Sequence, residues 1–116
     1  MRAAVYGFIS PDVDLDDFRP EDPLNFSFLL QALIGPSDRE AGESLQFIVC
    51  TPEWLARRVG SERVVLGRSL VVVDSPDVGM ILDHVERIIG AVESPSWAAL
   101  TRKLSCLGDY EFEEFV

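Results

Sequence analysis

The sequence predicts one α+β domain over residues 1–116, with a largely antiparallel β-sheet and helices packed on one face. A length of 116 residues is typical of a single domain, and a hydrophobic fraction of 47% is enough for a packed core. The first half contains three strand-like segments joined by loops too short for crossover helices, which favours antiparallel pairing. The second half adds a helix, a strand and two helices, giving the order β-β-β-α-β-α-α with a possible final strand.

Three strands are expected in the first half of the chain. Residues 2–9 are rich in β-favouring side chains and end at a Ser-Pro-Asp turn signal. Residues 25–34 are almost continuously apolar, as in a strand buried on much of both faces. Residues 44–50 alternate apolar and partly polar positions, so one face of this strand is fully apolar. The polar loop over residues 36–42 is expected to join the second and third strands as a hairpin.

A short helix and a fourth strand follow. Thr51 can cap a helix over residues 52–59, which begins with a proline and is expected to end at Gly60. Residues 63–74 are rich in Val and Leu and predict a strand, in which Gly67 marks a bulge or the strand start.

Two further helices are expected to begin at the Ser-Pro pairs of residues 75–76 and 94–95, which supply a cap and a proline in the first turn. Helical spacing places five side chains of the first on one face: Val78, Ile81, Val85, Ile88 and Val92. The second is lined by Trp97, Leu100, Leu104 and Leu107 and ends at Gly108. Residues 109–116 alternate aromatic and acidic side chains, which fits a short strand or an extended edge segment.

The charge and cysteine content exclude several classes of protein. Twenty acidic and ten basic residues give a formal net charge of -10, which opposes binding to nucleic acid. Two cysteines outside any CxxC pair indicate reduced thiols in a cytoplasm. No apolar run approaches the roughly 20 residues of a membrane span, and the N-terminal segment resembles a strand more than a signal peptide. We therefore expect a soluble, cytoplasmic protein without a membrane partner.

Half of the acidic residues fall in two clusters. The first could be a solvated loop or a docking surface for a basic partner. A calcium loop is disfavoured, because Asp17 and Pro23 stand where such a loop needs glycine and glutamate. The second cluster, interleaved with aromatics, could be a binding edge or an edge strand protected by charge. The clusters are Asp12, Asp14, Asp16, Asp17, Glu21 and Asp22, then Asp109, Glu111, Glu113 and Glu114 with Tyr110 between them.

Catalytic chemistry has little support in the sequence. The single histidine, His84, falls on a predicted helix without a nucleophile motif nearby, and no GxSxG, phosphate-loop or HExxH motif is present. We therefore expect a protein that is not an enzyme, with no catalytic residues, no cofactor and no metal ligands.

Several short motifs occur together in a series that resembles one protein family. The most specific are the Pro-Glu-Asp-Pro segment at residues 20–23 leading to Phe-Ser-Phe at 26–28, and the Cys-Thr-Pro-x-Trp-Leu turn at 50–55. Ser-Pro-Asp at 10–12, Ile-Gly-Pro at 34–36 and Tyr-Glu-Phe-Glu at 110–113 complete the series. In this order and spacing the chain resembles the immunity protein 8 family of bacterial polymorphic toxin systems.

The resemblance implies a cytoplasmic protein that binds the C-terminal domain of a toxin encoded nearby and blocks it without catalysis. The acidic charge suits a basic toxin surface, such as the active-site cleft of a nuclease. We therefore hypothesise that the two acidic clusters, with Tyr110, form the toxin-facing surface of a monomer or weak homodimer. Two alternatives stay open: an acidic, DNA-mimic-like module for another basic protein, and a small carboxylate-dependent hydrolase.

Overall fold

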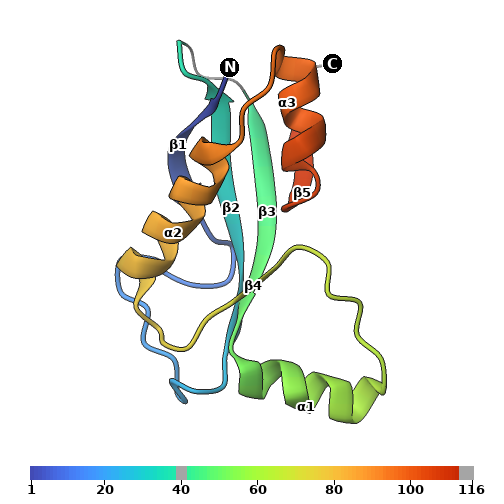
Figure 1. The fold of residues 1–116 in the computed structure, drawn as a ribbon. Helices are drawn as coiled ribbons and strands as arrows, with labels where there is room; N and C mark the ends of the chain where they lie inside the picture. The colour runs from blue at the N-terminus through green and yellow to red at the C-terminus, as the bar shows by residue number, and fades with distance from the viewer. Residues whose placement is uncertain (39–41, 113–116) are drawn as a thin grey trace.

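The computed structural model describes residues 1–38 and 42–112, which form one five-stranded sheet and three helices (Figure 1). The predicted α+β fold is confirmed. In chain order the elements are β1 (Ala3–Ile9), β2 (Ser27–Pro36), β3 (Glu43–Cys50), α1 (Pro52–Glu62), β4 (Leu70–Val72), α2 (Val78–Ala91), α3 (Trp97–Leu104) and β5 (Asp109–Phe112). No helix of the described part of the chain is long and apolar enough to cross a membrane.

The sheet is built around β3. β1 pairs with β2 and β2 with β3, each antiparallel, as the short connections predict. The other edge of β3 is shared between two strands: β5 runs antiparallel to its first half and β4 runs parallel to its last residues. β4 is parallel because α1 and the loop after it carry the chain back before the strand begins.

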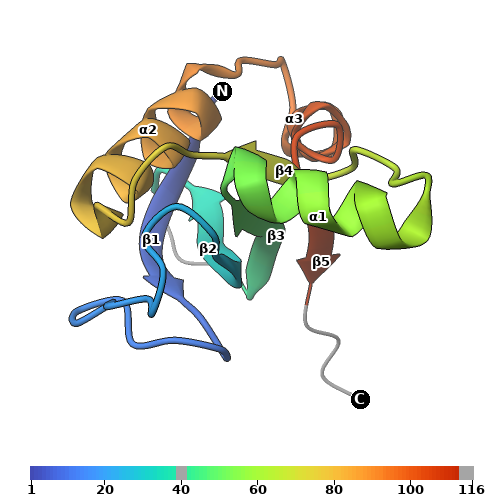
Figure 2. The same cartoon turned by 90° about the horizontal axis from the view of Figure 1, so that it is seen from below.

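The core lies between the sheet and the helices α2 and α3, which both cover the same face (Figure 2). Alternate positions of β2 and β3 point into it, because facing residues of an antiparallel pair share a side of the sheet. The sheet contributes Phe28, Leu30, Ala32, Ile34, Leu45, Phe47 and Val49, all buried. The helices contribute Ile81, Val85, Ile89, Leu100 and Leu104.

The buried face of α2 differs from the prediction most clearly at Ile88. Ile88 was expected to face the core but is 53% exposed, whereas Ile89 is fully buried. The helical repeat places Ile89 in line with Val85 and Ile81, four and eight residues earlier, and places Ile88 beside this row. Ile88 instead lines a groove described below.

Both later helices begin after their Ser-Pro pairs rather than on them. The Asp77 side chain accepts a hydrogen bond from the Met80 amide, and Ser96 accepts one from the Ala99 amide. These two residues are therefore the N-caps, and each Ser-Pro pair forms the turn that precedes the helix.

The predicted strand over residues 63–74 is reduced to the three residues of β4. Ile48 pairs with Leu70 in a parallel register, so the preceding residues would have to pair with the first half of β3. β5 already occupies that edge. Val64 and Leu66 are consequently 74% and 85% exposed in a loop, despite their β-favouring side chains.

The helix α1 extends two residues past the expected end at Gly60 and stops at Arg63, which has a φ of 72°. All of α1 lies within the described residues, and none of its side chains is buried. It projects from the end of the sheet where β3 finishes (Figure 1).

Candidate partner-binding surfaces

The first acidic cluster lies in the loop between β1 and β2, over residues 12–22, here called the acidic loop. Its apolar side chains Val13, Leu15 and Phe18 are half-buried against the core. The Phe18 ring contacts Phe26 and Phe28 edge-on, with centroids 5.1 and 4.9 Å apart. These anchors hold the backbone so that all six carboxylates of the loop are exposed.

Several of these carboxylates order the loop itself. Asp12 Oδ2 accepts a hydrogen bond from the backbone amide of Leu29 at 2.7 Å, two residues before Gln31, the first residue of β2 that pairs with β1. Asp14 and Asp22 each accept one from the amide two residues later, both at 2.9 Å. Such Asx turns fix an exposed loop without a regular element.

The other carboxylates of the acidic loop have few positively charged partners. Asp17 pairs with Arg19 at 2.8 Å, and both side chains are exposed, so the pair contributes little to stability. Within the described residues, the carboxylates of Asp16 and Glu21 have no partner. Six acidic residues against one basic residue leave the loop strongly negative.

Only the first part of the second acidic cluster lies in β5. Asp109 pairs with Arg68 at 3.2 Å, and Glu111 accepts a hydrogen bond from Gln46 Nε2 at 2.8 Å. Both lie on the face of the sheet opposite the helices, because their partners on β3 alternate with its buried positions. Glu113 and Glu114 lie outside the described residues.

Tyr110 points the other way, towards the core. Its hydroxyl donates to Glu43 Oε1 at 2.5 Å, and Trp97 Nε1 donates to the same oxygen at 2.9 Å. Burial, followed by the hydrogen bond to Glu43 and its charge, raises the pKa of Tyr110 well above its usual value. The Glu43 carboxylate thus ties both β5 and α3 to the start of β3, and the Tyr110 hydroxyl is not directed into solvent.

The acidic loop does not meet Asp109 and Glu111, the carboxylates of the second cluster that the structure describes. The acidic loop lies where β1 ends and β2 begins, whereas β5 pairs with the start of β3 on the opposite side of the sheet (Figure 1). A partner that touches both clusters must therefore span the sheet.

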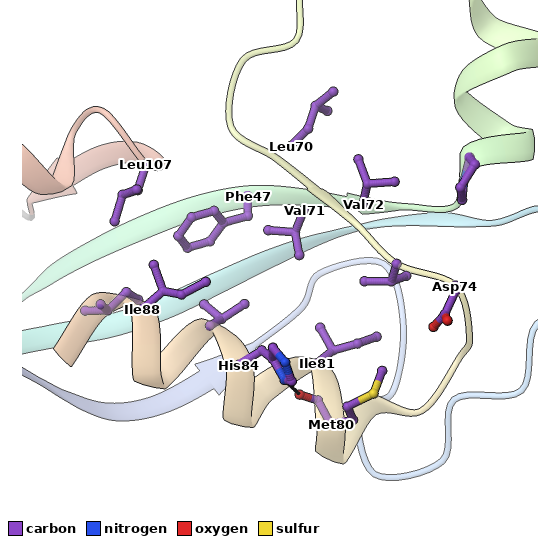
Figure 3. Close-up of a pocket in the computed structure, with 14 residues that line it drawn as sticks. Phe47, Leu70, Val71, Val72, Asp74, Met80, Ile81, His84, Ile88 and Leu107 are labelled. Carbon is purple, nitrogen blue, oxygen red and sulfur yellow. Dashed lines mark hydrogen bonds between the residues drawn. The ribbon is translucent and has the colours of Figure 1, made fainter. Parts of the chain in front are cut away.

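A groove of about 540 Å³ lies on the helix-covered side of the sheet (Figure 3). Its floor is formed by Phe47 of β3 and Val71 of β4, and Leu107 closes one side. The opposite wall is one row of α2 side chains at four-residue spacing: Met80, His84 and Ile88. The four-residue spacing of this row is visible in the sequence, but Ile88 was predicted to face the core, so the groove was not predicted.

Two ionisable side chains line the groove. His84 is exposed, and its Nδ1 lies 3.2 Å from the backbone carbonyl oxygen of Met80. Asp74 follows β4 and has no hydrogen-bonding or ionic partner in residues 1–38 and 42–112. The rest of the lining is almost entirely apolar, so the groove presents one unpaired carboxylate beside a hydrophobic surface.

Comparison with known proteins identifies the family. The model of the family described as immunity protein 8 matches residues 4–115, nearly the whole chain. The chain belongs to the immunity protein 8 family. The resemblance predicted from the short motifs is thereby confirmed, and membership supports an immunity function and implies a toxin partner. The chain has no significant match among curated proteins or solved structures.

For a member of the immunity protein 8 family, a binding role is consistent with the side chains present. Among the described residues, no three His, Cys, Asp or Glu side chains are grouped so that they could hold a metal ion. Cys106 is exposed, while Cys50 is buried and its burial raises the pKa of the thiol, which opposes nucleophilic use. Among the described residues, His84 contacts the Met80 carbonyl oxygen and no side-chain nucleophile.

Proposed function

We propose that this protein neutralises a cognate toxin in the cytoplasm by stoichiometric binding to the toxin's C-terminal domain. The observation that carries the proposal is membership of the immunity protein 8 family over residues 4–115. The net charge of -10 and the exposed acidic loop support a partner with a basic surface, for example a nuclease whose cleft binds phosphates.

The acidic clusters are proposed to contact or steer the toxin. The six carboxylates of the acidic loop are all exposed and face solvent beside a single arginine, so their field extends to an approaching cation. Asp109 and Glu111 add charge on the helix-free face of the sheet. Exposed charges chiefly raise the association rate, whereas the bulk of the affinity comes from buried anchors.

The direct test is calorimetric titration with the toxin domain encoded next to this chain, made catalytically inactive, at two salt concentrations. One-to-one binding with a nanomolar Kd or tighter, on the order of 12 kcal/mol, is expected for a protein that must leave almost no toxin free. Absence of binding at micromolar concentration would overturn the proposal and bring forward an acidic module for another basic protein.

The contribution of each acidic cluster can be measured separately because the clusters lie apart. Asp16→Lys/Glu21→Lys reverses two loop charges that have no partner in the described structure, so folding should be unaffected. The association rate at low salt is expected to fall by on the order of tenfold. The matched control reverses two charges on the outer side of α2, Asp83→Lys/Glu86→Lys.

The second cluster is tested by Glu111→Gln, which removes the charge and keeps an acceptor for Gln46. If neither the loop nor the strand variants alter the association rate or its salt dependence, the toxin-facing surface is elsewhere.

A further inference from the structure

The groove between α2 and β4 is lined by apolar side chains, some of which are exposed to solvent. Met80 and Ile88 are both exposed along it, and Phe47 and Val71 form its floor. Exposed apolar surface gathered in a concave site, unlike isolated exposed side chains, is typical of a place where a partner inserts a side chain. Figure 3 shows Met80, His84 and Ile88 along one helical wall, facing the strands.

The charges at the groove favour a cationic partner. Asp74 lines the groove without a partner in the described structure, and Asp77 is exposed at the start of α2. A carboxylate next to an apolar surface gains most from a Lys or Arg, since the bound partner excludes water from the pair. The net charge of -10 opposes a second copy of this chain in the same place.

The groove opens at the same end of the molecule as the acidic loop. The end of β3, Cys50, pairs with Ser27 at the start of β2 and with Val72 at the end of β4. The acidic loop leads directly into β2, and Asp74 follows β4 by two residues. A partner drawn to the loop by its charge therefore arrives near the groove, whereas β5 lies at the other end of β3.

We propose that this groove is the anchor site for the toxin, and that it takes an apolar toxin side chain next to a Lys or Arg that pairs with Asp74. The inference rests on the proposed function and adds to it the place and chemistry of the buried contact. Steering by the acidic loop and anchoring in the groove are thus assigned to different residues.

The experiment compares toxin affinity for two groove variants and two matched controls. Ile88→Asn removes an exposed apolar contact without adding charge, and Leu66→Asn makes the same kind of change at an exposed position outside the groove. Asp74→Lys reverses the groove carboxylate, and Asp83→Lys makes the same change on α2 outside the lining. Circular dichroism and thermal unfolding confirm that each variant is folded.

Ile88→Asn and Asp74→Lys are each expected to weaken binding by on the order of tenfold or more, whereas the controls stay within about threefold of wild type. If the wild type binds and the groove variants bind equally well, the anchor site is overturned while the proposed function stands. If the wild type itself does not bind the toxin, the proposed function fails and this inference fails with it. A wild-type dimer that Ile88→Asn dissociates would instead assign the groove to self-association and overturn the proposal.

Discussion

Gly108, immediately before β5, is the position where adding a single methyl group should perturb the fold most clearly. A Cβ at this residue would lie 2.8 Å from Cε1 of Phe47 and 2.9 Å from the carbonyl oxygen of Gln46. Carbon atoms pack best at about 3.5–4.0 Å, so Gly108→Ala requires a shift of roughly 0.7 Å. The Phe47 ring is buried and the Gln46 oxygen belongs to the central strand, so neither can move freely.

Overpacking of this kind costs about 2 kcal/mol. The typical unfolding entropy is about 2.1 cal/mol/K per residue. For this chain, the free energy of unfolding therefore falls by roughly 0.24 kcal/mol for each kelvin of heating near Tm. Gly108→Ala is therefore expected to lower Tm by about 8 °C in a calorimetric or circular dichroism melt.

The matched control is Gly90→Ala in α2, where a Cβ meets nothing within 4 Å. There, alanine reduces the conformational freedom of the unfolded chain and favours the helix, so a gain of about 0.5 kcal/mol is expected. A Tm for Gly108→Ala within about 2 °C of wild type would refute the close packing of the turn before β5 on β3.

Three further predictions concern single side chains. Asp12→Ala is expected to lower the free energy of unfolding by about 1 kcal/mol in chemical denaturation, because it removes the acceptor for a β2 amide, while Asp16→Ala changes it by less than about 0.5 kcal/mol. The raised pKa of Tyr110 means that the folded state keeps this proton above pH about 10, where the unfolded chain loses it. The stability advantage of wild type over Tyr110→Phe should therefore be constant below pH about 9 and decline above pH about 10; an advantage that grows with pH would contradict the bond to Glu43. A thiol reagent should modify only Cys106 in the folded protein and a second thiol after unfolding, and rapid modification of both would contradict the buried position of the other cysteine.

The strands of the first half could be predicted because their signals are local. The alternation of Leu45, Phe47 and Val49 gives the buried face of β3 directly, and the polar segment after Pro36 leads into a hairpin. The first residues of α2 and α3 were predicted less accurately, because the sequence does not show which polar residue near a Ser-Pro pair caps the helix. Asp77 and Ser96 do so in the folded chain.

The segment over residues 63–69 shows where a local pattern is insufficient. Val64 and Leu66 favour a strand, but the edge of β3 that they would need is taken by β5, more than 40 residues later in the chain. The pattern of neighbouring residues does not show this competition between distant segments for one edge of β3. Ile88 is a further case: its helical spacing allowed a core position, but in the folded chain Ile89 is buried and Ile88 lines the groove.

The sequence alone determined the charge of the protein, the order of most of its elements, its family and the acidic character of the surface we propose for the toxin. These follow from composition, short-range periodicity and motif order, which do not depend on how distant segments pack. Only the tertiary structure decided that the two acidic clusters lie apart, that Tyr110 points inwards to Glu43, and that an apolar groove opens beside Asp74. Each of these depends on which strand occupies an edge and on how closely two helices cover a sheet, and both are set by contacts between residues far apart in the chain.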